Sequence, residues 1–506
     1  MRILGLAVWL ALGSGVCCLQ GAAVREFRGL SNAVLDGGRA LVTLGNDPCS
    51  EVSGYEDGWV FRGCTNLVLK GWRFSTSHPV SCRGRIVKIE PEVHTYEVAF
   101  EPSTEPPVGA HLMGVNSIGR DGIPDKTIEF HGRPIAYARV GKGRIRIVAW
   151  ERTEMGKLFV GQSMVFRYSV YGPCVLRFSE CANVRIEGVS IERASGMGVV
   201  IEPLCRDFFF SDFSIGRKGS EEYFATGADG IHIVGLSGRL VLQGCRFWGL
   251  GDDALNVHAK SAEVLAVDTK ESLLEVACRD LQRCESPLPK GWCERGDKVV
   301  IYDGHTLLEK GRVAVEAVRR VAGSPRLALK LTTLPETVRE GDFLGNSRDY
   351  PKVAVRDCLV ERTRARGFLL QSEAITVEYC CFRDTSLPGI IIAPDFRYWN
   401  ECGPTRRCRI ENCRFERCAV EESPAAAGAL VVKTSHDNQI GPCQPGVHQS
   451  IIIRNCRFQG ARRHGIFAQG VDGLVLEANE FNACGEPQGV RLIDCRRSTR
   501  QPQKNP

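Results

Sequence analysis

Three aspartates are spaced as carboxylates that share one site. Asp229 precedes a short apolar segment at residues 230–233, and the neighbours Asp252 and Asp253 precede a second one at residues 254–257. Both segments follow the same pattern and lie one repeat apart, so a stacked repeat would bring the two sets of acids side by side. Clustered carboxylates are typical of acid/base catalysis, in which one acid gives a proton and another carboxylate activates water.

The elements that must position these acids belong to a repeat, in which a glycine is followed by an apolar residue, any residue and another apolar residue. The repeat begins at Gly198, Gly230, Gly367, Gly389, Gly428 and Gly465, with Ala254 in the glycine position before the aspartate pair's segment. Such alternation indicates β-strands. The 22 residues from Gly367 to Gly389 suit one coil of a solenoid. We therefore predict an all-β fold, a right-handed parallel β-helix whose coils bury their faces by stacking.

The residue before each glycine should form a column, with neighbours about 4.8 Å apart as in paired strands. In chain order the column reads Met197, Asp229, Asp253, Arg366, Pro388, Ala427 and His464. Two acids and a base are thus consecutive in the stack. Asp252 cannot point the same way as Asp253 on an extended chain, so it must reach the site from the turn at Gly251.

Two regions break the coil pattern, residues 77–168 and residues 259–346. Their alternating runs, joined by Gly and Pro turns, are typical of antiparallel strands, and each region is long enough for a small inserted antiparallel β-barrel domain. The β-helix then occupies residues 24–76, 169–258 with the catalytic coils, and 347–495, followed by a polar tail at 496–506. Because the second insertion begins just after His258, it should form a wall beside the aspartates.

The first residues predict export. Arg2, an apolar run at 3–16 and small residues at 21–23 are typical of a secretory signal peptide spanning 1–23. We expect a periplasmic or secreted protein; Cys17 and Cys18 leave lipoprotein anchoring as a less favoured alternative. No later stretch supplies the ~20 apolar residues of a membrane span. The net charge of +6 is small for 506 residues, and no basic stretch is interleaved with aromatics, which argues against nucleic acid as a partner.

The 23 cysteines would suggest disulfides in an exported protein. Five of them share one repeat position instead, which predicts a ladder of small buried side chains, with a few surface disulfides elsewhere. These five are Cys245, Cys358, Cys380, Cys413 and Cys456. A zinc site at residues 402–418 is disfavoured because the cysteines there form no Cys-x-x-Cys pair.

At residues 223–233 (YFATGADGIHI) and 249–258 (GLGDDALNVH) the chain resembles glycoside hydrolase family 110, the exo-α-1,3-galactosidases that remove terminal galactose from blood-group-B-type glycans. Residues 364–371 (RARGFLLQ) and 398–404 (YWNECGP) match in kind. The resemblance covers nearly the whole mature chain. It implies an oligosaccharide or glycoconjugate substrate, inversion at the anomeric carbon, and neither metal nor cofactor.

The resemblance also implies catalytic roles: Asp252 as general acid, and Asp229 with Asp253 as the pair that holds and deprotonates water. Repulsion between the two carboxylates of one column should raise the pKa of one of them. Candidate substrate-binding residues are Arg366, Gln371, Tyr398, Trp399, Glu401, His232, Asn256 and His258. For the arginine, the aromatics and the histidines, a purely structural role is about as common.

Other interpretations stay open. The acids could bind calcium, although no Asp-x-Asp-x-Asp loop is present, or they could simply cap turns. A polygalacturonase-like endo-hydrolase of acidic polysaccharide would share the β-helix and the acids, but should line an open cleft with basic residues. A non-catalytic glycan-binding β-helix would need no acids at all. We favour the exo-acting enzyme because two insertions can close a cleft into a pocket. A homodimer is left open.

Overall fold

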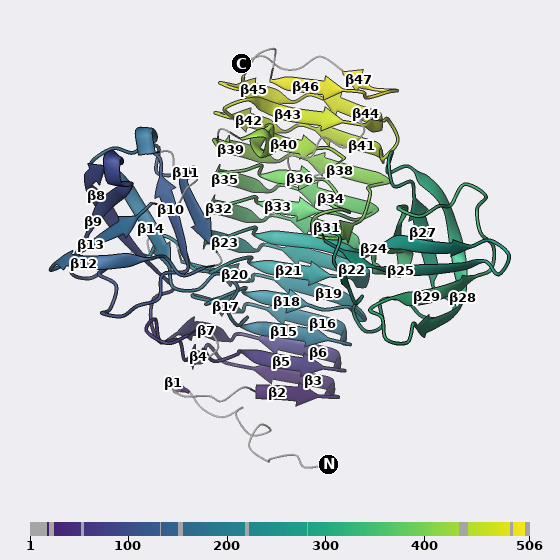
Figure 1. Cartoon of the computed structure of the whole chain (residues 1–506), viewed down its shortest axis with the longest axis horizontal. Helices are drawn as coiled ribbons and strands as arrows, with labels where there is room; N and C mark the ends of the chain where they lie inside the picture. Colours follow the sequence, from purple (N-terminus) through teal and green to yellow (C-terminus); the bar gives the residue numbers. More distant parts are fainter. Residues whose placement is uncertain are drawn as a thin grey trace.

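The computed structural model describes residues 18–19, 25–51, 55–131, 133–149, 155–217, 222–280, 282–421, 423–434, 444–485 and 489–500. Most of the predicted signal peptide, 1–23, therefore lies outside the described residues. The chain forms a parallel β-helix with two insertions on opposite sides (Figure 1), so the predicted β-helix is confirmed. Among the described residues no helix is long and apolar enough to cross a membrane.

Three parallel sheets form the β-helix, and most coils give one strand to each in turn. Sheet 1 contains β2 (Arg25–Arg28), β5 (Trp59–Arg62), β15 (Leu176–Ser179), β18 (Val199–Ile201), β21 (Ile231–Val234), β24 (Leu255–Asp268), β33 (Phe368–Leu370), β36 (Ile390–Ile392), β40 (Gly428–Val432), β43 (His464–Gln469) and β46 (Val490–Ile493). Sheet 2 contains β3 (Ser31–Asp36), β6 (Thr65–Lys70), β16 (Ala182–Glu187), β19 (Cys205–Ser211), β22 (Leu236–Gln243), β31 (Lys352–Arg356), β34 (Ala374–Glu378), β38 (Arg407–Glu411), β41 (His448–Arg454), β44 (Val471–Glu477) and β47 (Thr499–Arg500). Sheet 3 contains β1 (Cys18–Leu19), β4 (Leu41–Leu44), β7 (Arg73–Thr76), β17 (Ser190–Ile191), β20 (Ser214–Ile215), β23 (Arg246–Leu250), β32 (Leu359–Thr363), β35 (Cys381–Thr385), β39 (Arg414–Cys418), β42 (Arg457–Gln459) and β45 (Glu480–Asn482).

The first insertion leaves after β7 and returns at β15, so it lies where the chain passes from sheet 3 to sheet 1. It is one antiparallel sheet of β8 (Ser81–Glu90), β9 (Thr95–Phe100), β10 (Gly114–Ile118), β11 (Pro124–His131), β12 (Tyr137–Gly141), β13 (Arg144–Val148) and β14 (Ser163–Arg167). The strand order is β11-β10-β14-β8-β9-β13-β12, with short 3-10 helices at Pro91–Val93 and Met155–Lys157. This open series differs from the barrel expected for residues 77–168.

The second insertion leaves from the far end of β24 and returns at β31, between sheets 1 and 2. Its strands are β25 (Leu273–Arg279), β26 (Glu285–Ser286), β27 (Lys298–Tyr302), β28 (Glu309–Arg320), β29 (Leu327–Leu331) and β30 (Phe343–Asn346), followed by a 3-10 helix at Ser347–Asp349. Antiparallel pairing runs β24-β25-β29-β28-β27-β30 and back to β24, which closes a barrel. Because sheet 1 alone lies between both attachment points, the insertions flank it on either side (Figure 1).

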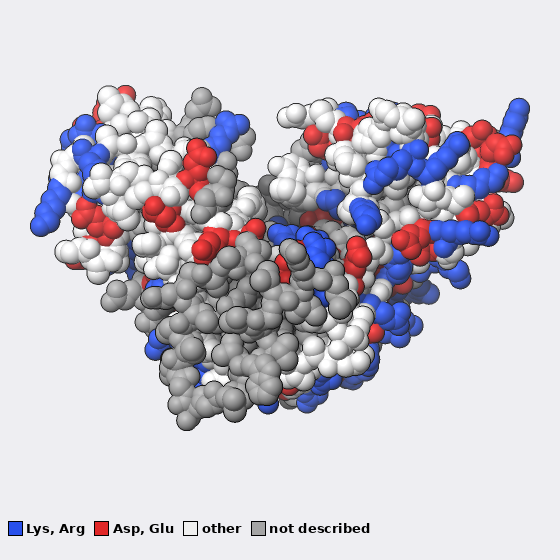
Figure 2. Space-filling view, turned by 90° about the horizontal axis from the view of Figure 1, so that it is seen from below, with Lys and Arg blue, Asp and Glu red and all other residues white. Residues whose placement is uncertain are grey.

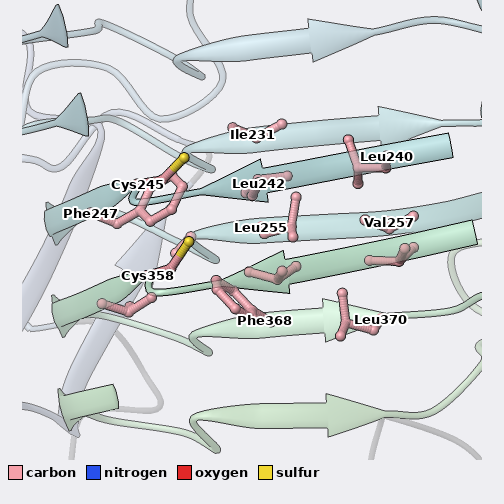
Figure 3. Close-up of a cluster of buried hydrophobic side chains, with 14 of the residues drawn as sticks. Ile231, Leu240, Leu242, Cys245, Phe247, Leu255, Val257, Cys358, Phe368 and Leu370 are labelled. Atoms are coloured by element: carbon pink, nitrogen blue, oxygen red, sulfur yellow. The ribbon is translucent and has the colours of Figure 1, made fainter. Parts of the chain in front are cut away.

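Alternation puts every second side chain of sheet 1 into the apolar interior. Ile231, Leu255 and Phe368 are in register and fully buried, as are their partners two residues on (Figure 3). The cysteine ladder lies beside them in the same core, with Cys245 above Cys358. The residues between these positions, including His232 and Asn256, therefore face outward.

Register confirms the predicted column except at one place. Asp229, Asp253 and Arg366 each lie two residues before the paired Ile231, Leu255 and Phe368. The next coils pair Ile390 with Leu430, and Gly428 with His464, so Gly428 rather than Ala427 continues the column. The 3-10 helix at Pro424–Ala426 lengthens this turn, and the glycine pattern alone gives no sign of that extra length.

The expected surface disulfides are wrong for the cysteines whose side chains the structure describes, since these cysteines are free. Most are buried, which is the usual environment of an unpaired cysteine side chain. The five-residue ladder is confirmed, and Asn479 continues it, with its Oδ1 accepting a hydrogen bond from the Cys456 amide at 3.0 Å.

Candidate active site

The three aspartates lie on two stacked turns, at the start of sheet 1. The Gly230 amide donates to the Asp253 carbonyl at 2.8 Å, which fixes one turn on the other. Gly251 is required here: a Cβ at this position would come within 2.4 Å of the Thr226 carbonyl oxygen and 2.6 Å of that of Gly227. Its amide donates to Thr226 Oγ1 at 3.1 Å. The turn that presents Asp252 is therefore packed against the preceding coil.

One carboxylate oxygen from each of Asp229, Asp252 and Asp253 lies within 4.8 Å of the other two. Asp229 and Asp253 are 5% and 1% exposed, whereas 17% of the Asp252 side chain is exposed. Asp252 thus reaches the cluster from the turn, as the alternation of side chains required, and is the member most open to a ligand.

Burial raises the pKa of both column aspartates. For Asp253 the pKa rises to about 7, because burial and the charges of Asp252 and Asp229 outweigh the effect of Arg366. For Asp229 burial is again the largest cause; the hydrogen bond from His232 lowers the pKa and the charge of Asp252 raises it. The expected upward shift is confirmed, although desolvation contributes more than the predicted mutual repulsion.

Asp229 and His232 form a hydrogen-bonded pair. The distance from Asp229 Oδ2 to His232 Nδ1 is 2.6 Å. On the far side His258 Nδ1 faces the Ala259 carbonyl at 3.2 Å and must carry hydrogen, while burial lowers the pKa of His258 to about 4. A neutral His258 therefore accepts at Nε2, so His232 Nε2, 3.3 Å away, donates to it. One further proton then lies between His232 and Asp229.

This chain of polar groups continues along the outer face of sheet 1. Glu401 Oε1 lies 3.5 Å from His258 Nε2, which in this tautomer carries no proton to donate, and Gln371 donates to Glu401 Oε2 at 2.8 Å. The oxygens Asn256 Oδ1 and Gln371 Oε1 are buried and have no hydrogen-bond partner among the described residues. Buried acceptors without a donor are costly, so these two oxygens suit the hydroxyl groups of a sugar.

Two arginines hold the acids. Arg366 donates to both oxygens of Asp253, from its amide at 2.9 Å and from Nη1 at 2.7 Å. Arg366 was a candidate for sugar binding, and in this structure it neutralises an acid. Arg364 Nη2 lies 2.8 Å from Asp252 Oδ2. Arg364 was not among the predicted site residues, although its position two residues before Arg366 puts it in the same turn.

The first insertion also supplies groups that sequence reasoning missed. Glu129 of β11 accepts a hydrogen bond from Arg364, and Arg167 of β14 donates to the turns of both acid segments. Tyr171 is half-exposed, and its partial burial together with the charge of Asp252 raises its pKa to about 12. No local pattern marks these residues, because Glu129 and Arg167 come from a different sheet and Tyr171 lies in the connection between β14 and β15.

The remaining candidates lie at the opposite end of sheet 1. Glu401 and Cys402 form β37 (Glu401–Cys402), which pairs with β24 beyond His258. Tyr398 and Trp399 are 42% and 47% exposed, with ring centroids 4.6 Å apart, and the Trp399 carbonyl accepts from Lys260 at 2.7 Å. Exposed aromatic rings of this kind suit the apolar face of a sugar.

The molecule is hollowed between the two insertions (Figure 2). Acidic and basic side chains gather along the hollow, with one lobe on each side. Since both insertions leave from the ends of sheet 1 strands, the outer face of sheet 1 is the floor between them. The acids at one end of this floor and the aromatics at the other would contact different parts of one ligand.

The three carboxylates could also hold a cation. Among the described residues, they form the group of acidic side chains close enough together to bind a metal ion. Calcium takes 6–8 oxygens, however. Here Arg364 and Arg366 already neutralise Asp252 and Asp253. This pairing favours acid/base chemistry over metal binding.

Comparisons with known proteins agree with the motifs. No protein-family model matches the chain. It is 26% identical over 403 residues to an alpha-1,3-galactosidase B of Akkermansia muciniphila, covering 77% of this chain and 47% of that protein. A Parabacteroides distasonis protein of the same name is 25% identical, covering 90% and 75%. One of Bacteroides thetaiotaomicron is 22% identical, covering 82% and 69%. The chain thus spans from about half to three quarters of the length of these relatives.

Among solved structures the chain is similar to the catalytic domain of a glycoside hydrolase family 87 alpha-1,3-glucanase in complex with nigerose. The TM-score is 0.39 at 10% identity, with 94% of this chain and 62% of that chain covered. An exopolygalacturonase from Thermotoga maritima gives 0.37 at 11%, covering 93% and 82%. The curated relatives confirm the resemblance that the two aspartate motifs indicated.

Proposed function

We propose that this chain, a homologue of the alpha-1,3-galactosidases, is a glycoside hydrolase that removes terminal α-1,3-linked galactose from blood-group-B-type and related glycans. The observation that carries the proposal is the convergence of Asp229, Asp252 and Asp253 within 4.8 Å at the start of sheet 1, the sheet that the two insertions flank. A hollow closed on two sides favours the end of a glycan over the middle of a long polysaccharide.

In the proposed reaction Asp252 protonates the oxygen that leaves with the aglycone. It is the most exposed of the three acids, and its carboxylate lies 2.8 Å from Arg364 Nη2 and within 4.8 Å of the other two carboxylates. Water held by Asp229 and Asp253 attacks the anomeric carbon as the glycosidic bond breaks. The water proton passes to Asp229, whose bond to His232 disperses the added charge.

The resemblance implies inversion, which calls for acid and base about 6.5–9.5 Å apart. The nearest carboxylate oxygens of the three aspartates lie within 4.8 Å of one another, which is shorter than this range. The anomer of the released galactose is therefore the decisive measurement. Proton NMR of a B-type trisaccharide digest reports both the bond cut and the anomer released. We expect β-galactose first, with the same rate in the presence of a chelator. Initial α-galactose would exclude inversion, and release of no galactose, or cleavage of polygalacturonate instead, would refute the proposal.

We further propose that the chain is exported, on the basis of residues 1–23. Intact mass of the protein purified from the periplasm and medium should show cleavage after Ala23. We also propose a homodimer as one possible assembly. Light scattering on the same sample would show it as twice the mass of one chain. If the protein stayed in the cytoplasm with the mass of the full chain, export would be contradicted.

A further inference from the structure

One arginine of the first insertion contacts both catalytic turns. Arg167, the last residue of β14, is fully buried. Its Nη1 donates to the Gly227 carbonyl at 2.7 Å and to the Gly251 carbonyl at 3.0 Å. Gly227 and Gly251 occupy equivalent positions in successive coils, each two residues before a column aspartate. A single guanidinium therefore joins the turn of Asp229 to the turn of Asp252 and Asp253.

A second arginine, which belongs to the β-helix itself, also binds the Gly251 carbonyl. Arg364 Nε donates to Gly251 at 2.5 Å, while its other nitrogens bind Asp252 and Glu129. The carbonyl that precedes Asp252 is thus held from two directions. Fixing this peptide fixes where the Asp252 side chain leaves the turn.

Arg167 remains charged in an environment that disfavours a charge. Burial and, to a smaller extent, the charge of Arg364 lower its pKa to about 10, against the charges of Asp252, Glu129 and Tyr171. Its remaining contacts are Asn116 Oδ1 at 3.4 Å and the ring of Phe224 at 5.6 Å, while its Nε has no hydrogen-bond partner among the described residues. A buried cation bound mainly to neutral carbonyls is a poor way to stabilise a fold.

We propose that Arg167 is a positioning residue of the catalytic site, through which the first insertion holds the Asp229 turn and the Asp252 turn in the spacing that hydrolysis requires. This inference rests on the proposed galactosidase function. It makes the first insertion part of the catalytic machinery. Displacements of about 1 Å at reacting groups can cost 10²-fold in rate.

The test compares Arg167→Met and Arg167→Lys with the parent protein on a B-type trisaccharide. Met keeps an unbranched side chain without donors, and Lys keeps the charge but lacks the rigid guanidinium whose Nη1 donates to both carbonyls. We expect kcat to fall about 100-fold for Met and about 10-fold for Lys, with KM within about twofold because neither substitution alters the floor residues. Arg146→Met is the matched control, because Arg146 pairs with Glu97 within the same inserted sheet.

Each outcome decides the matter. Rates are normalised to the folded fraction, measured by near-ultraviolet circular dichroism. If kcat per folded molecule is unchanged in both Arg167 variants, or if KM alone rises, the inference is wrong. The same holds if Arg146→Met loses as much rate as Arg167→Met. Should the parent itself release no galactose, the proposed function fails instead, so the two failures are distinguishable.

Discussion

The two insertions flank the same floor but attach to it in different ways. The first sends charged side chains into the catalytic turns, through Arg167 and through Glu129 by way of Arg364. The second shares strand β24 with sheet 1 and packs against the helix through an apolar cluster that includes Tyr302, Phe396 and Cys402. One insertion thus reaches the three aspartates, and the other continues strand β24, which carries Asn256 and His258.

This difference suggests a division of labour between the two ends of sheet 1. Changes near the first insertion should affect the rate of bond cleavage, because the acids lie there. Changes near the second should affect substrate affinity or local stability. Four substitutions test this division, in order of decreasing expected effect.

Asp252→Asn should have the largest effect. Loss of a general acid costs typically 10²–10⁴ in rate, so we expect kcat on a trisaccharide to fall about 10³-fold. The same variant should hydrolyse α-galactosyl fluoride at a rate within about tenfold of the parent, because fluoride leaves without protonation. Steady-state kinetics on both substrates makes the measurement.

Asp357→Asn is the control, since Asp357 is an exposed carboxylate at a corner of a later coil. Its kinetics should match those of the parent. If Asp252→Asn lost both activities equally, Asp252 would not be the proton donor. If Asp252→Asn kept both activities, the turn beside the first insertion would have only a structural role. The proposed division between the two ends of sheet 1 would then be wrong.

Arg366→Met should move the pH profile. Burial raises the pKa of Asp253 to about 7, and Arg366 lowers it. Removing the arginine raises this pKa further, so Asp253 ionises, and can hold the attacking water together with Asp229, only at higher pH. The acid limb of kcat/KM should therefore shift upward. Activity at pH 6 should fall more than at pH 8. Arg356→Met, at an exposed ion pair with Glu378, should leave the limb in place. A shift of the alkaline limb instead would make Asp253 the proton donor.

These tests build on what the sequence predicted. Periodicity located the coils, because stacking imposes the same apolar positions on each, and it brought Asp229, Asp253 and Arg366 into one column. Outward-facing His232 and His258 followed from alternation. The pattern failed at Gly428, where a 3-10 turn shifted the register by one residue.

The rest could not be predicted because it depends on contacts between separate sheets. Arg167 lies 60 residues from Gly227 in sequence and Glu129 lies 235 from Arg364. Antiparallel strands of an insertion have no fixed register with the coils, so no repeat relates them. The closed barrel and the open sheet likewise share the same alternating sequence pattern and differ only in how their strands pair.

Trp399→Ala should weaken binding at the second end of the floor. Its exposed ring offers a stacking surface, and we expect KM to rise about tenfold at nearly unchanged kcat, which corresponds to about 1.4 kcal/mol. Tyr379→Ala, at an exposed aromatic between β34 and β35, is the control. A fall in kcat with constant KM would place Trp399 with the catalytic groups and contradict the division.

Tyr350→Phe should have the smallest effect, and it tests the second insertion most directly. The Tyr350 hydroxyl lies 3.0 Å from that of Tyr302 and 3.4 Å from Cys402 Sγ. Losing these contacts costs about 1 kcal/mol, so amides of β30 and β37 should exchange about fivefold faster, with kcat and KM unchanged. Tyr55→Phe is the matched control, because the buried Tyr55 hydroxyl has no hydrogen-bond partner among the described residues. If Tyr350→Phe lowered kcat as Arg167→Met is expected to, the barrel would be coupled to the chemistry as closely as the open sheet is.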